Sequence, residues 1–347
     1  MRVDQILCAA GPVDGVTGQA LAYRRLLRGW GWQGEDYAPV QAAGMPGGAV
    51  RPLHQLRPAR AEVLVVHYSG YAPGLAGLVA AARRSLLVSH NVTPAHYFWA
   101  SDPAEAVRCQ LGRAQLGELA SLAGALAAVS EFNAADLRSL AGREVSVIPV
   151  LFDRRGLPDS RPHRTSSPTV LFVGRLTPHK RQDLVIRAFA RWRTREPDAR
   201  LVLVGTPLSP DFAATLAGLA AELAPGAVAF ESGLSAGQLW ERYRAADAFL
   251  CLSEHEGFCI PLLEAFHFGL PVIARDTGAV GEVIGEAGVL VDGDDGVGTV
   301  AELLGIVVSD GELRAELRVR AERRLAQFAH DAVGVRLREQ LAMMAAS

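Results

Sequence analysis

Short runs of consecutive hydrophobic residues recur along the chain, with longer amphipathic stretches between them. Continuous runs, unlike alternating ones, are typical of parallel strands that are buried on both faces. They predict strands at residues 5–9, 63–67, 86–89, 126–130, 145–150, 169–173, 201–204, 227–230, 248–252, 271–274 and 289–291.

The stretches between these runs carry hydrophobic residues at helical spacing, for example at residues 19–29, 180–193, 211–223 and 239–246. Strands that alternate with helices predict an α/β fold built from doubly wound parallel sheets. The alternation breaks once, at residues 151–168, which are rich in Pro, Ser and charged residues and show no period. We interpret this segment as a linker between two Rossmann-like domains.

Composition narrows the class of protein. The chain has 347 residues, enough for two domains that each have a hydrophobic core. Its formal net charge of −2 argues against a dedicated nucleic-acid-binding protein, and its hydrophobic content of 50% argues against disorder. We expect no signal peptide and no transmembrane segment, and the four scattered cysteines indicate reduced thiols in a cytoplasmic protein.

One residue count is unusual. Lysine and arginine together number 35, but Lys180 is the single lysine, so 35 − 1 = 34 are arginine. Lys180 ends the segment Gly-Arg-Leu-Thr-Pro-His-Lys, which follows a predicted strand and precedes a predicted helix. Ligands of open α/β sheets bind at the carboxyl ends of strands, and a helix N-terminus favours anions. Arg175 and Lys180 therefore predict a diphosphate site, although exposed cations without a ligand are the ordinary alternative.

A second segment follows the predicted strand 248–252. It places Glu256 on a loop before a helix and Glu264 one turn inside that helix, among hydrophobic residues. Gly257 allows a ligand to approach the backbone closely. A carboxylate accepts strong hydrogen bonds from hydroxyl groups, so the pair favours sugar recognition. The alternative is a helix cap formed by Glu256 and a surface ion pair formed by Glu264.

Together these segments resemble the retaining family 4 glycosyltransferases of the GT-B fold, also called glycosyl transferases group 1, of the bacterial polysaccharide and natural-product type. The resemblance rests on G-R-L-x-P-x-K, on E-G-F-x-x-P-x-x-E-A, and on G-x-P-V-I-A at residues 269–274. It implies two Rossmann-like domains that face a cleft. Residues 1–160 would form the acceptor-side domain, residues 161–328 the nucleotide-sugar donor domain, and residues 329–347 a helix that crosses back to the first domain.

The resemblance also implies roles for individual residues. Arg175 and Lys180 would bind the diphosphate of the donor, Glu256 would face the transferred sugar, and Glu264 would bind the ribose. Further donor contacts are expected from Gly174, Gly205, Gly257, Phe258, Cys259 and Ile260.

The N-terminal half carries a weaker donor signal. Gly15 and Gly18 lie in a loop after the first predicted strand, where backbone N–H groups could approach a phosphate. Tight turns also need glycine, so the loop alone is not specific. In similar glycosyltransferases the corresponding loop closes over the donor phosphates.

Polar residues follow two further predicted strands. His67 and Tyr68 end one of them, and His90 and Asn91 follow the next. The run His-Asn-Val-Thr-Pro at residues 90–94 resembles a segment of the same family in which the histidine lies in the catalytic cleft. We therefore predict that His90 is catalytic and that His67, Tyr68 and Asn91 lie on the acceptor side.

The sequence Asp292-Gly293-Asp294 matches the D-x-D pattern of metal-dependent glycosyltransferases of another fold. It follows a predicted strand, so we expect Asp294 or Asp295 to cap the next helix instead. No His, Cys or Asp cluster has metal-ligand spacing, and we expect neither a metal nor another cofactor.

A basic and aromatic stretch lies near the first predicted helix. Trp30 and Trp32 follow Arg24, Arg25 and Arg28, and such a face could lie on an anionic membrane. Packing of the helix end on the sheet is the favoured interpretation.

We therefore predict a retaining glycosyltransferase that moves a hexose-type sugar from a nucleotide-diphosphate donor to a hydroxyl group of a small molecule, glycan or lipid. The alternatives are a nucleotide-sugar epimerase of the same fold and a non-catalytic nucleotide-sugar-binding partner protein. Nucleic acid is not an expected partner, and peripheral membrane contact stays open.

Overall fold

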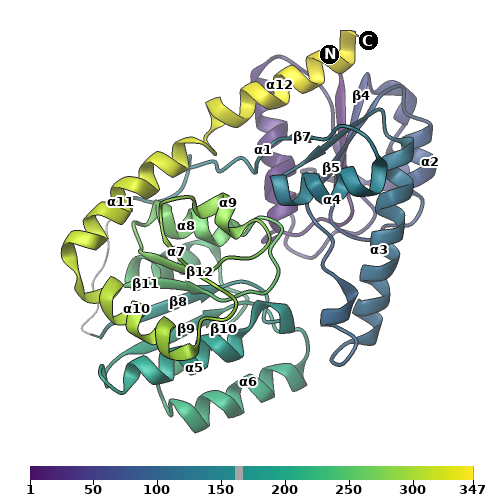
Figure 1. The fold of residues 1–347 in the computed structure, drawn as a ribbon. Coiled ribbons are helices and arrows are strands. Elements are labelled where there is room, and N and C mark those ends of the chain that lie inside the picture. Colours follow the sequence, from purple (N-terminus) through teal and green to yellow (C-terminus); the bar gives the residue numbers. More distant parts are fainter. Residues whose placement is uncertain (161–166, 347) are drawn as a thin grey trace. The chain divides into compact units, whose positions relative to one another are not determined.

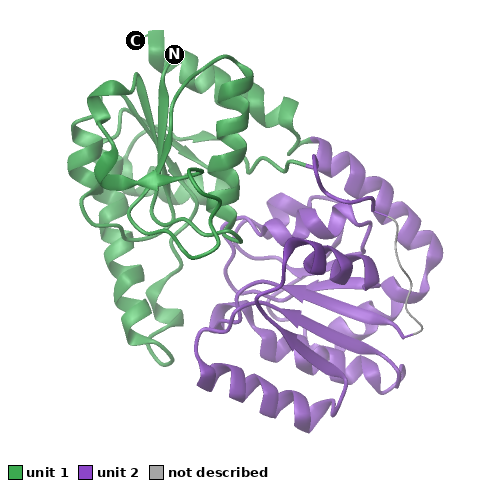
Figure 2. Ribbon diagram, turned by 180° about the vertical axis from the view of Figure 1, so that it is seen from behind, with its two compact units in different colours: residues 1–153, 327–347 green, residues 154–326 purple. Residues whose placement is uncertain are grey.

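The computed structural model describes residues 1–160 and 167–346. The chain forms two compact units, Met1–Asp153 with Gln327–Ser347 and Arg154–Ala326 (Figure 2). The chain passes from one unit to the other a few residues before the boundaries expected from the sequence.

The first unit, here unit 1, contains a seven-stranded sheet of order β3-β2-β1-β4-β5-β6-β7 in which every neighbouring pair is parallel. Its central strands are fully buried, as the continuous hydrophobic runs predicted. The strands are β1 Val3–Leu7, β2 Asp36–Ala38, β3 Arg51–Pro52, β4 Val63–Tyr68, β5 Ser85–Ser89, β6 Ala125–Ala128 and β7 Ser146–Val147. The helices are α1 Gly15–Gly29, α2 Leu75–Ala80, α3 Pro103–Leu122, α4 Glu131–Ala141 and α12 His330–Ala346.

Two strands of unit 1 were not predicted, β2 and β3. Each is shorter than four residues, and β2 begins with the buried Asp36. A hydrophobic pattern cannot reveal such strands, because their place in the sheet depends on pairing with β1 and on a buried ion pair.

That ion pair corrects one expectation about Arg24. Its side chain is buried, and its guanidinium group lies 2.7 Å from an Asp36 carboxylate oxygen. It also donates a hydrogen bond to the carbonyl oxygen of Val3. Arg24 therefore ties α1 to the sheet and does not belong to a basic face for a membrane.

The last helix, α12, packs in unit 1. Val333, Leu337 and Leu341 are buried, and the Arg338 guanidinium lies 5.7 Å from the centre of the Trp30 ring. A Cβ atom at Gly334 would lie 3.3 Å from a Leu26 methyl group, so this glycine allows α12 to approach α1 closely. The Trp30 ring thus packs against the C-terminal helix, whereas the favoured interpretation placed this helix end on the sheet.

The second unit, here unit 2, contains a six-stranded parallel sheet of order β10-β9-β8-β11-β12-β13. Its strands are β8 Thr169–Val173, β9 Arg200–Val204, β10 Val228–Glu231, β11 Ala248–Cys251, β12 Val272–Arg275 and β13 Val289–Val291. Its α-helices are α5 Gln182–Arg193, α6 Pro210–Leu223, α7 Ala236–Ala245, α8 Ile260–His267, α9 Val280–Ile284, α10 Val297–Ser309 and α11 Gly311–Ala326. Figure 1 shows α5 and α6 on one face of this sheet and α8 and α9 on the other.

The predicted linker is partly described. Residues 161–166 of it lie outside the described residues. Before that gap, the Phe152 N–H donates to the Phe328 carbonyl in unit 1, and the Pro158 carbonyl lies 3.0 Å from His267 Nε2 in unit 2. Each end of this stretch is therefore bonded to its own unit.

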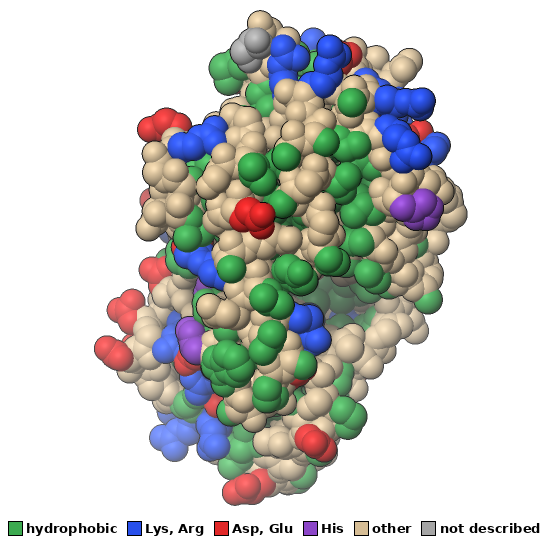
Figure 3. Space-filling view, turned by 90° about the vertical axis from the view of Figure 1, so that its right-hand side faces the viewer, with side chains coloured by type: hydrophobic (Ala, Val, Ile, Leu, Met, Phe, Trp, Pro, Cys, Tyr) green, Lys and Arg blue, Asp and Glu red, His purple; other side chains and the backbone are tan. Residues whose placement is uncertain are grey.

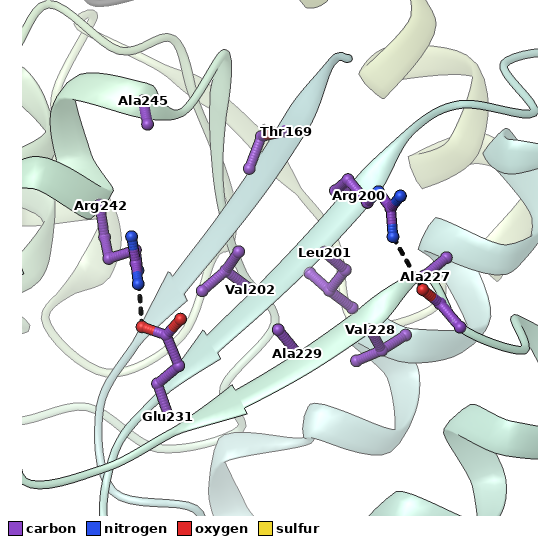
Figure 4. A pocket seen from close by; sticks show the side chains of 11 residues that line it. Thr169, Arg200, Leu201, Val202, Ala227, Val228, Ala229, Glu231, Arg242 and Ala245 are labelled. Atoms are coloured by element: carbon purple, nitrogen blue, oxygen red, sulfur yellow. Dashed lines mark hydrogen bonds and ion pairs between the residues drawn. The ribbon is translucent and has the colours of Figure 1, made fainter. Parts of the chain in front are cut away.

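A hollow lies over β8, β9 and β10 in unit 2 (Figure 4). Arg242 donates to Glu231 at one side of it, and Arg200 donates to the Gly226 carbonyl at the other. None of the residues that line it belongs to the predicted donor site.

The surface offers no simple clue to a partner. On the face drawn in Figure 3, basic side chains stand in several separate groups, with acidic and hydrophobic side chains between them. Across the described residues, no helix combines the length and hydrophobicity needed to cross a bilayer.

The backbones that follow β8 and β9 are in direct contact, and this yields a test. A Cβ atom at Gly205 would lie 1.8 Å from the Gly174 carbonyl oxygen. We expect Gly205→Ala to lower the free energy of unfolding by more than about 2 kcal/mol, because backbone atoms must move to accept the methyl group. Urea denaturation measures the loss.

Gly218→Ala is the matched control. Gly218 is exposed on α6, and a Cβ atom there meets no other atom within 4 Å. This change should stabilise the protein by about 0.5–1 kcal/mol through helix propensity. Equal effects of the two substitutions would contradict the close contact at Gly205.

Candidate active site

The turn after β8 carries the single lysine. Gly174 directly follows the strand, and the short 3-10 helix Pro178–Lys180 leads into α5. Arg181 has φ +50° and separates that turn from α5. Lys180 therefore lies at the carboxyl end of the sheet and just before the N-terminus of α5, which agrees with its predicted place.

The loop between β11 and α8 carries the first glutamate. Glu256 is buried, and its Oε1 accepts a hydrogen bond of 2.6 Å from Lys180 Nζ. Because β8 and β11 are neighbours in the sheet, the loops that follow them meet at the same edge. The structure thus brings the two motifs of the sequence together through one ion pair.

The surroundings of Lys180 keep it charged. Burial lowers the pKa of an amine, but the charge and hydrogen bond of Glu256, together with the neighbouring Cys259 and Cys251, outweigh this effect, and the pKa of Lys180 is raised above its ordinary value. An ammonium group has three N–H donors, and Glu256 Oε1 takes one of them. The other donors can serve an anionic ligand at the exposed side of the lysine.

Residues outside the predicted set hold this loop. Glu254 forms ion pairs with Arg181 and Arg275, and its carbonyl accepts a hydrogen bond from Thr277. A Cβ atom at Gly278 would lie 2.2 Å from the Glu256 carbonyl oxygen. Sequence reasoning missed these residues, although Thr277 and Gly278 follow β12 at the same carboxyl edge, a signal that could have indicated them.

The second glutamate has a partner that the sequence did not reveal. Glu264 is half-buried on α8, and its Oε2 accepts a hydrogen bond of 2.5 Å from the Tyr243 hydroxyl group. Tyr243 is fully buried between Phe249 and Phe268, whose rings stack on it. Burial raises the pKa of Glu264 to about 7, and the Tyr243 hydrogen bond offsets only part of that rise. The surface ion pair that was the alternative for Glu264 is absent from the described residues.

The first turn of α8 has no side-chain cap. Cys259 precedes the helix with φ +72° and ψ +69°. Gly257, Cys259 and Ile260 are half-buried, whereas the Phe258 side chain is buried. Glu256 does not cap α8, so the capping alternative is wrong.

The first cation, Arg175, is exposed. Across the described residues its guanidinium group takes part in no hydrogen bond or ion pair, while its carbonyl accepts from Gln182. Gly174 and Gly205 lie beside it, in the backbone contact described above. The guanidinium N–H groups of Arg175 are therefore available to bind an anion, on the same turn as Lys180.

In the glycine loop of unit 1, the carboxylate of Asp14 already caps the N-terminus of α1. Asp14 is the N-cap of α1, and its Oδ2 accepts hydrogen bonds of 2.7 Å from the backbone N–H and the hydroxyl of Thr17. Gly15 and Gly18 are exposed in the first turn of the helix. A phosphate would meet the Asp14 charge here, which weakens the predicted role of this loop.

A chain of hydrogen bonds in unit 1 fixes the orientation of His90. Both N–H bonds of the Gln5 amide are used by acceptors, the Ala20 carbonyl and Asp36, so Gln5 Oε1 must accept from His67 Nε2 at 2.9 Å. His67 Nδ1 is then an acceptor, and His90 Nε2 donates to it at 3.0 Å. We assign His90 as the Nε2–H form, with Nδ1 as an acceptor.

Both imidazoles are neutral. Burial lowers the pKa of His90 to about 3, and burial, with the neighbouring His90 and Arg24, lowers that of His67 well below its ordinary value. His90 is half-buried and His67 fully buried. Of the predicted pair, His90 is thus the one that solvent can reach, and His67 holds it in place.

One acceptor-side expectation changes, that for Tyr68, and the one for Asn91 stays a prediction. Tyr68 is fully buried, and its hydroxyl donates to the Gly112 carbonyl at 2.8 Å and lies 3.1 Å from the amide oxygen of Gln115 on α3. This corrects the expectation for Tyr68, because a side chain bonded inside the core cannot contact an acceptor. Asn91 has φ +83°, and its side-chain amide donates to Asn133 on α4.

The D-x-D segment has a local role, although not the expected one. Asp295 accepts a hydrogen bond from the Asp292 N–H, and Gly296 is the N-cap of α10. The expected cap by Asp294 or Asp295 is therefore wrong. Among the described residues, one group has ligand atoms close enough for a metal, namely Cys251, Glu256 and Cys259, with all three atoms within 4.8 Å of one another.

Comparison with known proteins shows the family and the fold of this chain. The family profile described as glycosyl transferases group 1 matches residues 153–324. A D-inositol 3-phosphate glycosyltransferase of Acidothermus cellulolyticus is 31% identical over 82% of this chain and 67% of its own length. The chain belongs to the group 1 glycosyltransferases. Other relatives are matched over less than half of their length, among them a GDP-mannose-dependent mannosyltransferase of Mycolicibacterium smegmatis, 33% identical over 44% of this chain and 41% of its own.

Solved structures show that this glycosyltransferase has the GT-B fold. Anabaena HepE in complex with UDP and glucose has a TM-score of 0.78 at 19% identity, over 99% of this chain and 100% of that one. Sucrose-phosphate synthase from Thermosynechococcus elongatus has a TM-score of 0.75 at 19% identity, over all of both chains. At this identity the likeness concerns the fold of the two Rossmann-like sheets.

The raised pKa of Glu264 makes the stability of this glycosyltransferase depend on pH. The folded-state pKa is about 7, above the ordinary value of 4.5. Protonated Glu264 therefore makes its full contribution to the free energy of unfolding below about pH 4.5. This contribution is lost as pH rises to about 7 and above. We expect the difference in free energy of unfolding between wild type and Glu264→Gln to fall across this window, as measured by urea denaturation.

Tyr243→Phe is the matched variant. It removes the hydrogen bond that lowers the pKa of Glu264, so the loss of stability should move to higher pH. Parallel pH profiles for all three proteins would show that Glu264 does not titrate in this range.

The state of His90 can be observed directly. Nitrogen-15 NMR of the imidazole should report the Nε2–H form and no titration until the pH approaches 3, since burial disfavours the cation. In His67→Gln, the imidazole of His90 should no longer be held in the Nε2–H form. A His90 resonance that titrates near its ordinary pKa in wild type would contradict the assignment.

Proposed function

We propose that this glycosyltransferase is a retaining enzyme that transfers a hexose-type sugar from a nucleotide-diphosphate donor to a hydroxyl group. The donor would bind to unit 2 and the acceptor to unit 1. The observation that supports this most directly is the ion pair of Lys180 and Glu256, which unites the two predicted donor motifs in unit 2.

The charges of this site suit a diphosphate leaving group. Arg175 offers an exposed fork of N–H donors, and Lys180 remains an ammonium ion through its pairing with Glu256. Both can stabilise the negative charge that grows on the diphosphate as the bond to the sugar breaks. Glu256 in turn can accept hydrogen bonds from sugar hydroxyls with its second carboxylate oxygen.

Glu264 would accept hydrogen bonds from the nucleoside part of the donor. Glu264 is held by Tyr243 through one oxygen, Oε2, which leaves Oε1 for the hydroxyl groups of a ribose. Gly205 would border the base, at the point where its backbone touches that of Gly174. The printed names of similar proteins mention both UDP and GDP-mannose, so the base is a matter for experiment.

On the acceptor side, His90 offers a neutral imidazole whose Nδ1 accepts a hydrogen bond. It can orient a hydroxyl group, but it does not present a charge at neutral pH. No carboxylate is assigned as a nucleophile in this proposal. The departing diphosphate would accept the proton of the acceptor hydroxyl in a front-face displacement.

A screen of nucleotide sugars tests the proposal. A donor present at 100 times its Kd should add about 2.7 kcal/mol of stability, visible as a rise in Tm. Lys180→Ala should then reduce kcat at least about a hundredfold and change the donor KM much less, because the ammonium acts mainly on the leaving group. Lys180→Arg should also reduce kcat, since a planar guanidinium does not fit the buried position beside Glu256.

Arg187→Ala is the control, because Arg187 is exposed on α5 and belongs to no part of the site. An unchanged kcat with a raised KM for Lys180→Ala would contradict the proposed role. Epimerised nucleotide sugar formed without an acceptor would identify an epimerase, and the absence of a Tm shift with every donor would contradict a donor site in unit 2.

A further inference from the structure

Two cysteines flank the glutamate of the proposed donor site. Cys251 is the last residue of β11, and Cys259 directly precedes α8. Their Sγ atoms lie 4.0 Å apart, and both thiols are free. The loop between them carries Glu254, Glu256 and Gly257, so a bond between the two sulfurs would close a ring around Glu256.

We propose that Cys251 and Cys259 form a reversible disulfide that switches off donor binding. The switching effect rests on the proposed function, whereas the formation of the bond does not.

The two cysteines differ in mobility. Cys251 is buried in a strand that pairs on both sides, with Cys251 opposite Ala274 of β12. Cys259 is half-buried and occupies a left-handed backbone conformation that L-residues adopt at a cost. A disulfide needs an S–S distance of about 2.05 Å. Cys259 Sγ must therefore move towards Cys251 Sγ. The strained backbone of Cys259 can change its conformation to allow this movement.

The surroundings activate one thiol. The contact with the Cys259 thiol lowers the pKa of Cys251 more than burial and the charge of Glu256 raise it, and the same contact, together with burial, raises the pKa of Cys259 well above its ordinary value. The Ser253 hydroxyl lies 3.3 Å from Cys251 Sγ, and the Lys180 ammonium lowers its pKa further. Cys251 therefore loses its proton first, and the thiolate is the reactive form of cysteine.

Hydrogen peroxide is a sufficient oxidant. The Cys251 thiolate attacks one peroxide oxygen, the O–O bond breaks, and a sulfenic acid and one water form. The Cys259 sulfur then attacks Cys251 Sγ, and the sulfenic oxygen leaves as a second water with the thiol proton. Two thiols and one peroxide thus give one disulfide and two waters, and a dithiol reductant reverses the oxidation.

The same atoms could be considered as ligands of a soft metal ion, because Glu256 Oε1 lies 3.9 Å from Cys251 Sγ. However, Lys180 Nζ holds that oxygen at 2.6 Å and would place a positive charge beside the ion. The charge of Lys180 favours a covalent bond between the sulfurs over a bound cation.

Closure would disturb the donor site directly. The movement of Cys259 displaces the backbone of the first turn of α8 and the loop that places Glu256 against Lys180. A misplacement of about 1 Å in such a site can cost about a hundredfold in activity. We therefore expect oxidation to weaken donor binding by between about tenfold and a hundredfold.

The experiment treats the full chain with hydrogen peroxide and then blocks the remaining thiols. Intact mass should show the loss of two hydrogen atoms, and peptide mapping should link Cys251 to Cys259. Donor-induced Tm shifts are measured before oxidation, after oxidation and after reduction by dithiothreitol, and the shift should disappear and then return.

Cys251→Ser should abolish both the linked peptide and the loss of the Tm shift on oxidation. Cys259→Gly, which suits the left-handed backbone, is the second variant if the serine protein does not fold, and its response is compared with its own reduced state. Cys8→Ala with Cys109→Ala is the control, because both residues lie in unit 1, and it should respond like wild type.

Three results would overturn the proposal: free thiols at both positions after oxidation, stoichiometric zinc released from the pair on thiol blocking, or equal donor binding by the reduced and oxidised forms. If reduced wild type binds no donor, the proposed function fails, while the mass measurement still decides whether the disulfide forms.

Discussion

The ion pair of Lys180 and Glu256 is the interaction on which the site of this glycosyltransferase depends. It joins two loops that are 76 residues apart in sequence and follow neighbouring strands. Both partners are largely buried, so removal of either would leave an unpaired charge inside the protein. The pair therefore fixes the relative position of the two loops and keeps an ammonium ion available to an anionic ligand.

The remainder of unit 2 supports this pair through backbone contacts and ionic side chains. Gly278 lets the loop after β12 touch the Glu256 backbone, and Gly205 lets the loop after β9 touch that after β8. Glu254 is held between Arg181 and Arg275 from two other elements. Four strand ends thus meet at one edge of the sheet, which leaves little freedom for the acidic loop. Cys259 is the exception, because its backbone is strained and its thiol faces Cys251.

Unit 1 uses neutral groups where unit 2 uses charges. The chain from Gln5 through His67 fixes His90 as an uncharged imidazole, and burial keeps it so at any pH near neutrality. This contrast is consistent with a division of labour in which one unit stabilises a charged leaving group and the other orients a hydroxyl group. The buried pair of Arg24 and Asp36 supports the same chain, since Asp36 also fixes the Gln5 amide.

The hydrophobic pattern and the motifs of the chain were enough to predict the two parallel-sheet domains, the family and the two segments that carry Lys180 and Glu256. Continuous hydrophobic runs marked all the longer strands, because a strand buried on both faces must be apolar throughout. The short strands β2 and β3 were missed, since their positions depend on pairing partners. Only the tertiary structure decided that Tyr68 is a core residue, that Tyr243 binds Glu264, that Gly278 supports Glu256, and that Cys251 meets Cys259. These contacts join residues from different elements, and the distance between such residues is set by how strands and helices pack, which the local pattern of a chain does not encode.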